Sequence, residues 1–122
     1  MAEMSNYLEN ALINATLRNT SYTSPTTTYL ALYTSDPTDA DTGTEITGGS
    51  YVRQAITFGA PSNGVSTNSA NVEFPVCTSS WGTITHIGIM DALTAGNLLY
   101  HTALATSKVF FVTGKQIGRA HV

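Results

Sequence analysis

The clearest hydrophobic pattern in the chain lies between Trp81 and Leu104, WGTITHIGIMDALTAGNLLYHTAL. β-Branched residues dominate its first part, from Thr83 to Ile89, and apolar residues return from Leu98 to Tyr100. The intervening segment, Asp91 to Asn97, contains Thr, Gly and Asn, which favour a chain reversal through positive φ angles and side-chain hydrogen bonds. This pattern predicts two antiparallel strands joined by a polar turn.

A helical period is present near the N-terminus. Ser5 can cap the first turn of a helix, and Arg18 suits the negative end of its dipole. We expect one amphipathic helix over residues 5–18, too short to be stable alone, so it must pack on its own sheet or be exchanged with a neighbouring subunit. The apolar positions that define it are Tyr7, Leu8, Ala11, Leu12 and Ala15.

Further alternating segments predict short strands at Tyr29 to Thr34, Tyr51 to Phe58, Ala70 to Val76 and Ser107 to Val112. The first of these has apolar side chains on both faces, as expected for a strand that is covered on both sides. Turn signals rich in Gly, Pro, Ser and Asn separate the segments. Together with the hairpin, they predict an all-β fold, an antiparallel, jelly-roll-like β-sandwich of about six strands with one N-terminal α-helix.

Composition and charge narrow the possible partners. A chain of 122 residues supports one domain, which we place at residues 1–115. Charged residues make up only 11%, a composition that suits closely packed particle proteins as well as an ordinary β-domain. The net charge is -3 and the five Lys and Arg residues are spread singly, which leaves no basic stripe for phosphates. We therefore expect no nucleic-acid partner.

Cysteine content and apolar runs indicate the cellular setting. Cys77 is the only cysteine, which excludes an intrachain disulfide and a multi-cysteine zinc site. We expect it to be a small buried apolar residue. The N-terminus lacks a basic region followed by an apolar core, and no apolar run approaches roughly 20 residues. We therefore expect synthesis in a cytoplasm, with no membrane partner.

The longest predicted loop, Ser35 to Ser50, holds four of the eight acidic residues. Clustered carboxylates could bind calcium, but the order of residues here does not reproduce an EF-hand loop, so a solvated, turn-rich loop is favoured. Arg53 could pair with one of these acids and hold the loop against the sheet, or it could face solvent. The four acidic residues are Asp36, Asp39, Asp41 and Glu45.

The strongest candidates for chemistry are His86 and His101, one on each strand of the predicted hairpin. Hydrolysis would need a nucleophile such as Ser79 or Ser80 and an orienting acid such as Asp91, yet the chain contains no nucleophile motif. Two histidines in a hairpin form cross-strand or backbone hydrogen bonds more often than a metal site. We therefore expect no catalytic, cofactor-binding or metal-binding residues, and no cofactor.

Five ordered segments resemble a family of small virion proteins of tailed bacteriophages, described as tail-fibre-like or head-decoration proteins. They are LALYTSDPTDADTG, GGSYVRQAITFGAP, NSANVEFP, WGTITHIGIMDA and GNLLYHTAL, and the resemblance spans Tyr7 to about Ser107. The segments are specific as a set, although none contains a catalytic signature. The resemblance implies a non-enzymatic structural component of the virion, made in the cytoplasm of a bacterial host.

Two classes of function remain open. The first is a structural subunit of the tail or capsid that assembles with other virion proteins and with itself, as a trimer or another homo-oligomer. The alternative is a module at the tail tip that binds a host glycan or receptor through aromatic and histidine side chains. The candidate surface residues for such binding are Tyr33, Tyr51, Trp81, His86 and His101, with Tyr22 as a further aromatic side chain.

The last segment, Gln116 to Val122, is QIGRAHV. It can be back-translated into a nucleotide sequence that contains the opening of a widely used sequencing adapter. We therefore expect residues 116–122 to be a non-native scar of sequence assembly, as in metagenomic data, and a native strand to be missing after about Lys115. The unpaired edge left near Phe110 or Phe111 would then favour aggregation.

Overall fold

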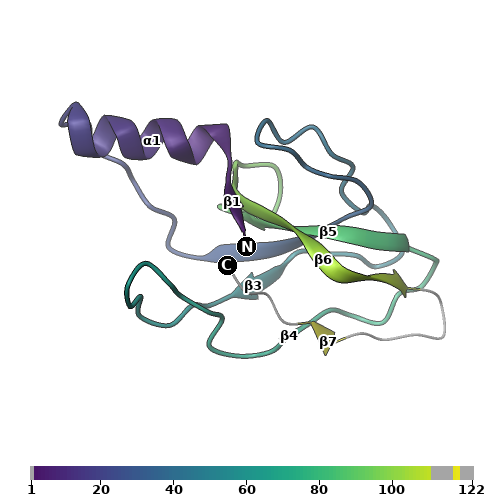
Figure 1. Cartoon of the computed structure of the whole chain (residues 1–122). Coiled ribbons are helices and arrows are strands. Elements are labelled where there is room, and N and C mark those ends of the chain that lie inside the picture. The colour runs from purple at the N-terminus through teal and green to yellow at the C-terminus, as the bar shows by residue number, and fades with distance from the viewer. Residues whose placement is uncertain (1, 111–116, 119–122) are drawn as a thin grey trace.

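The computed structural model describes residues 2–110 and 117–118 of the chain, with side chains over residues 2–106. One five-stranded antiparallel sheet forms the centre of the molecule, in the strand order β1-β6-β5-β2-β3 (Figure 1). A separate two-stranded ladder pairs β4 with β7. In chain order the elements are β1 (Glu3–Met4), α1 (Asn6–Leu17), β2 (Thr28–Tyr33), β3 (Gln54–Ile56), β4 (Val72–Glu73), β5 (Gly82–Met90), β6 (Leu98–Phe110) and β7 (Ile117–Gly118).

This architecture confirms the prediction of an antiparallel all-β fold with one helix in the described part of the chain. The predicted jelly-roll sandwich is not confirmed, because the second ladder has only two residues in each strand. The segment between β3 and β5 is rich in Gly, Pro, Ser and Asn and runs mainly as turns and isolated bridges, such as Phe58 with Asn68. Strands β3 and β4 are therefore shorter than predicted.

The hairpin of β5 and β6 is confirmed, and its two strands pair from Gly82 and Phe110 to Met90 and Leu98. The Asp91 carboxylate accepts a hydrogen bond from the Asn97 backbone N–H at 2.7 Å and closes the turn. The strand predicted at Ser107 to Val112 is confirmed for residues 107–110, but these residues continue β6 and are not a separate strand. No turn residues interrupt the chain before Ser107, so the strand simply runs on; residues 111 and 112 lie outside the described residues.

One face of the sheet carries the main hydrophobic core. Leu30, Leu32, Ile87 and Ile89 pack there against side chains from the segment that follows β3 and precedes β5. Tyr51 and Phe74 stack at a centroid distance of 6.1 Å, and Trp81 meets both rings edge-on. The Trp81 indole N–H donates to the carbonyl oxygen of Gly49 at 2.8 Å, as its burial requires. Cys77 is buried in this cluster, as predicted.

The opposite face of the sheet carries a smaller core, formed by Ala31, Tyr33, Met90 and Leu98. The acidic loop between β2 and β3 lies against this face, where the Tyr33 hydroxyl donates to the Asp41 carboxylate at 3.1 Å. Strand β2 is therefore covered on both faces, as its sequence predicted. The loop is also the element that positions the candidate site.

Helix α1 begins after Ser5, whose hydroxyl oxygen accepts a hydrogen bond from the Leu8 backbone N–H at 3.2 Å, as expected of a cap. Leu8 is its buried residue, whereas Ile13 and Leu17 are 51% and 79% exposed. Figure 1 shows the helix contacting the sheet near its first turn and extending away from it. The helix is thus anchored on its own domain at one end only.

The predicted domain boundary after residue 115 lies outside the residues that the structure describes. Ile117 and Gly118 are described and pair with β4. The remaining residues of the segment 116–122, and Phe111, are not described. The origin of this segment therefore stays a prediction.

Candidate functional site

The two hairpin histidines lie on the same face of the sheet but bond to different partners. His86 is opposite Ala103 and His101 is opposite Gly88, which places the two histidines diagonally across β5 and β6. The Nδ1 atom of His86 lies 2.8 Å from the Thr85 hydroxyl. His101 is the more buried of the two and faces the acidic loop.

Three chain segments meet at His101. Its Nε2 atom lies 2.8 Å from Oδ1 of Asp39 in the acidic loop and 3.7 Å from Oε2 of Glu3 in β1. Glu3 is the direct cross-strand partner of His101, so the pairing of β1 with β6 sets this proximity. Oδ1 of Asp36 lies on the other side of the ring, 3.9 Å from Nδ1. The His101 side chain itself is only 4% exposed.

Backbone contacts hold the acidic loop against this histidine. The carbonyl oxygen of Asp39 accepts a hydrogen bond from the Asn6 N–H at the start of α1, at 2.8 Å. The Asp36 carboxylate accepts from the Thr38 N–H at 2.9 Å, and Thr38 itself has a φ of 60°. The loop is turn-rich, as predicted, and the Asp36 and Asp39 side chains stay 59% and 46% exposed while they lie beside His101.

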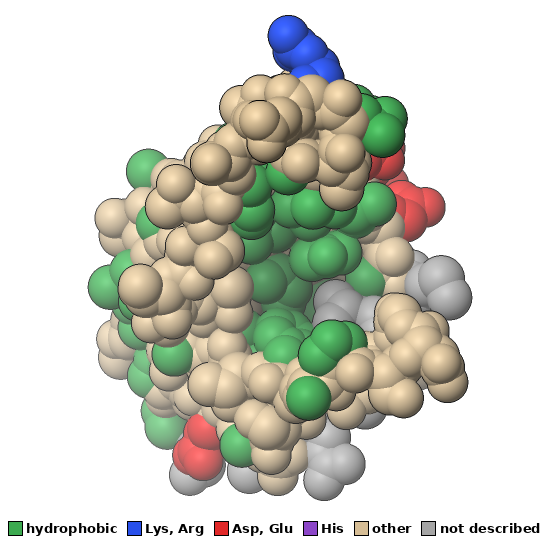
Figure 2. Space-filling model, turned by 90° about the vertical axis from the view of Figure 1, so that its left-hand side faces the viewer, with side chains coloured by type: hydrophobic (Ala, Val, Ile, Leu, Met, Phe, Trp, Pro, Cys, Tyr) green, Lys and Arg blue, Asp and Glu red, His purple; other side chains and the backbone are tan. Residues whose placement is uncertain are grey.

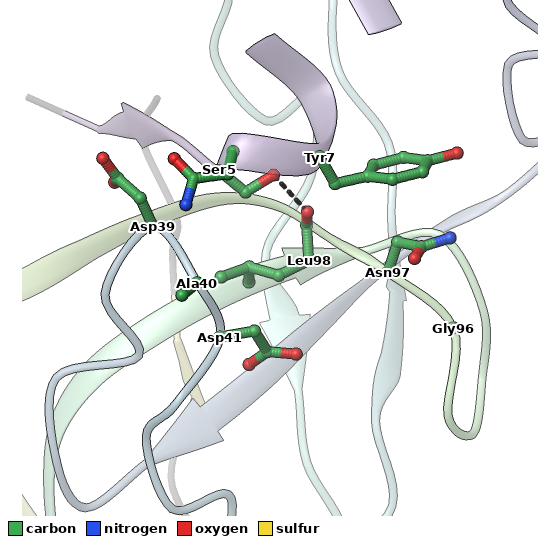
Figure 3. Close-up of a pocket in the computed structure, with 9 residues that line it drawn as sticks. Ser5, Tyr7, Asp39, Ala40, Asp41, Gly96, Asn97 and Leu98 are labelled. Carbon is green, nitrogen blue, oxygen red and sulfur yellow. Dashed lines mark hydrogen bonds between the residues drawn. The ribbon is translucent and has the colours of Figure 1, made fainter. Parts of the chain in front are cut away.

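A cavity of about 300 Å³ lies beside this junction, under the first turn of α1 and next to the hairpin turn (Figure 3). Ser5 donates a hydrogen bond to the Leu98 carbonyl oxygen at its inner end. The cavity walls combine carboxylate, amide and phenol groups, which could hydrogen-bond a small hydroxylated ligand. The lining residues are Ser5, Asn6, Tyr7, Asp39, Ala40, Asp41, Gly96, Asn97 and Leu98.

Arg53 pairs with Glu45, which confirms one of the two alternatives considered from the sequence. The Arg53 side chain is 8% exposed and the Glu45 side chain 23%. The Tyr51 hydroxyl also donates to Glu45, at 2.7 Å. Burial, together with this acceptor, raises the pKa of Tyr51 above its ordinary value of 10.0. These contacts among Arg53, Glu45 and Tyr51 hold the loop on the sheet, and they have a structural role.

Two of the three residues considered as catalytic partners, Asp91 and Ser80, hydrogen-bond within local turns. The Asp91 carboxylate accepts hydrogen bonds from the backbone and side chain of Asn97, at 2.7 and 3.0 Å. The Ser80 hydroxyl oxygen accepts from the Gly82 N–H at 3.2 Å. Neither contact connects to His86 or His101, whose described partners lie elsewhere.

Three of the aromatic residues considered for ligand binding, Tyr33, Tyr51 and Trp81, contribute to the core. Tyr33 is 2% exposed and Trp81 is 4% exposed, while Tyr51 packs against both Phe74 and Trp81. Binding at these positions stays a prediction, and little of Tyr33 or Trp81 is available to a ligand in this structure. The double-sided apolar pattern of β2 already indicated that Tyr33 faces a covered side.

An apolar hollow lies on another part of the surface and was missed from the sequence. Figure 2 shows hydrophobic side chains gathered in it below α1. Its volume is about 270 Å³, and no charged residue is among the side chains that line it. Those lining residues are Thr28, Phe58, Gly64, Ser66, Ile89, Leu99 and Tyr100. Sequence pattern could not reveal the hollow, because three strands and the loop after β3 supply its walls.

Among the described residues, α1 is too short and too polar to cross a membrane. No curated protein matches the chain. A family model, described as podophage GP4 fiber I protein gp80, matches residues 3–117, which include every site described above. That span covers nearly all of the sequence, so the chain belongs to this family of podophage fibre proteins.

Proposed function

We propose that this chain is a non-enzymatic structural subunit of a phage tail fibre, which assembles with copies of itself and with other virion proteins. The family supports a structural fibre role. The observation that carries the assembly step is the apolar surface on α1, where Ile13 and Leu17 are 51% and 79% exposed. Neither nucleic acid nor a membrane has a part in this proposal.

The helix supports association because its own domain covers so little of it. An isolated helix of 12 residues is marginally stable in water, and α1 is anchored only by its first turn. A neighbouring subunit that covered Ile13 and Leu17 would stabilise the rest of the helix while burying apolar surface. The few charged residues of the chain would impose little desolvation penalty on such packing.

The polar cavity beside Asp39 favours a second candidate function, a module that binds a host glycan or receptor. Its carboxylates and the amide of Asn97 could hydrogen-bond sugar hydroxyls, and the half-exposed ring of Tyr7 could stack on a sugar face. In this second candidate function the ligand binds in the cavity and not at the buried side chains of Tyr33 and Trp81. It would place the chain nearer the tip of the tail.

Light scattering after size-exclusion chromatography tests the assembly proposal. We expect an oligomer, for which a trimer is one candidate, and a shift toward monomer in Ile13→Ser/Leu17→Ser. Asn10→Ser, an exposed polar change on the same helix, is the matched control and should keep the oligomer. A monomeric parent chain at tens of micromolar would overturn self-assembly.

Co-sedimentation with purified phage parts distinguishes a location on the tail from one on the capsid. The labelled chain should sediment with purified tails rather than with capsids. Binding to capsids alone would favour a decoration role over the tail fibre. Binding to a glycan array without either particle would favour the receptor module, and Asp41→Asn/Asn97→Ala should then abolish it.

A further inference from the structure

Glu3, Asp39 and His101 present three metal-ligating atoms to one point. Two carboxylate oxygens and one imidazole nitrogen all lie within 4.8 Å of one another, and the two N–O distances from His101 are 2.8 and 3.7 Å. Ligand atoms that share one zinc ion are separated by about 3 Å, because each lies roughly 2 Å from the metal. Small side-chain movements would therefore bring all three atoms onto a single ion.

The environment of the other ring nitrogen is a second, independent indication. A metal-bound histidine normally directs its remaining N–H toward a carboxylate, which fixes the ring and leaves the opposite nitrogen free to bind. Oδ1 of Asp36 lies on that side of His101, 3.9 Å from Nδ1. This distance exceeds a hydrogen bond, and the same oxygen accepts from the Thr38 N–H at 2.9 Å, so the carboxylate would have to move toward Nδ1 to complete the arrangement. Burial of His101 keeps the ring in this orientation.

The charge of the side chains around His101 also favours a bound cation. The ion pairs that the structure gives to Glu3, Asp36 and Asp39 all go to His101, which can contribute at most one positive charge. The buried arginine is already paired with Glu45 on another part of the loop. Three carboxylates around one imidazole therefore carry an excess of negative charge, which a divalent cation would balance.

We infer that Glu3, Asp39 and His101 form a binding site for a divalent transition-metal ion, with Zn²⁺ the best match. A nitrogen ligand favours Zn²⁺ over Ca²⁺ and Mg²⁺, which prefer oxygen. Three protein ligands leave further positions to water. A bound ion would link β1, the acidic loop and β6, and so fix the N-terminal segment to the sheet.

The site departs from the sequence expectation of no metal for a specific reason. That expectation considered the acids of the loop together and the two histidines together. The set found here takes one residue from each group and adds Glu3, which no pattern connected with them. Calcium binding by the loop alone is still not expected.

Calorimetric titration with Zn²⁺ and thermal unfolding test the site. We expect one ion per chain and a rise in Tm of roughly 3 °C or more at saturating Zn²⁺, but less than about 1 °C with millimolar Ca²⁺. Glu3→Gln and Asp39→Asn change partly exposed carboxylates, and each should weaken Zn²⁺ binding at least tenfold. Asp36→Asn should weaken it by about tenfold through the imidazole. Glu9→Gln and His86→Gln are matched controls and should bind as the parent does.

Nitrogen-15 spectra of the histidine side chains give a readout that needs no variant. Zn²⁺ should shift the His101 Nε2 resonance of the parent protein and leave His86 unchanged. Absence of any Zn²⁺ effect at millimolar concentration would overturn the site. Binding that survives Glu3→Gln/Asp39→Asn, or that shifts a different histidine, would overturn it as well. Each of these results is independent of the oligomeric state.

Discussion

The guanidinium of Arg53 forms a two-pronged ion pair with the carboxylate of Glu45, with Nε–Oε2 and Nη2–Oε1 distances of 2.8 Å each. Its Nη1 atom donates to the carbonyl oxygens of Ala92 and Ala95 in the hairpin turn, also at 2.8 Å. A single buried side chain thus joins the acidic loop, the approach to β3 and the turn between β5 and β6. The planar fork of donors is what makes this possible.

Replacing Arg53 with lysine should therefore lower the free energy of unfolding by about 3 kcal/mol, because an ammonium cannot satisfy one carboxylate and two carbonyls in this geometry. Urea denaturation would measure the loss. Arg18→Lys is the matched control, since Arg18 is exposed and its side chain donates to Asn14 alone among the described residues, and it should change stability by less than about 0.5 kcal/mol. Equal effects of the two substitutions would contradict the structural role of Arg53.

Two adjacent glycines provide a comparison of backbone strain with steric clash. Gly48 and Gly49 both have positive φ, at 74° and 61°. A Cβ atom on Gly48 would meet nothing within 4 Å, whereas one on Gly49 would lie 2.7 Å from both Ser79 Oγ and Trp81 Nε1. We expect Gly48→Ala to cost about 1 kcal/mol and Gly49→Ala about 3 kcal/mol. Tryptophan fluorescence during urea unfolding would measure the loss of stability in both variants. Equal losses would mean that the side chains of Ser79 and Trp81 move aside at little cost.

Tyr33 and Tyr51 should make the protein sensitive to alkali. Burial raises the pKa of both hydroxyls above the ordinary 10.0, and the carboxylates of Asp41 and Glu45 beside them add to the effect. The folded state therefore holds these protons more tightly than the unfolded chain. Their contribution to stability is complete below pH 10 and is lost as the pH rises above it.

Urea unfolding between about pH 8 and pH 11 would measure this slope. Tyr51→Phe removes one of the two groups, so its stability should fall less steeply with pH than that of the parent, although it starts from a lower value. Identical slopes for the two proteins would show that Tyr51 does not contribute to the alkaline loss.

Ser5→Ala should destabilise the fold by about 1–2 kcal/mol. The substitution removes the cap of α1 and leaves the Leu98 carbonyl oxygen without the hydroxyl that donates to it. Ser21→Ala, at an exposed position in the segment after the helix, is the control and should be nearly neutral. Circular dichroism should show that Ser5→Ala loses helical signal before the sheet unfolds.

Local pattern predicted the elements that local interactions determine. The hairpin and α1 were predicted because alternating β-branched residues, a polar turn and a capping serine all act within a few positions. Strands β3 and β4 are shorter than predicted because their ladders depend on distant partners and are interrupted by Gly and Pro. The pairing of Arg53 with a loop acid could be anticipated, since the loop directly precedes it.

The cluster around His101 could not be predicted in the same way. Strand β1 has only two residues and no period to detect, so its place beside β6 depends on the sheet topology. Asp39 reaches His101 because the loop folds back over the face of the sheet that carries Tyr33, which local spacing does not specify. The histidine and one loop acid were each noticed, but only the tertiary structure brings them together with Glu3.

The contact between Ser5 and Leu98 joins positions 93 residues apart, and this separation dictates an order of events during synthesis. The capping serine leaves the ribosome early, but its partner on β6 is made only when most of the chain has emerged. Until then, α1 lacks its contacts with β6 and, at 12 residues, has little stability of its own. The contacts of β2 with β3 and with β5 close shorter loops and can form sooner. The residues around Ser5 are thus translated well before the strand on which they dock.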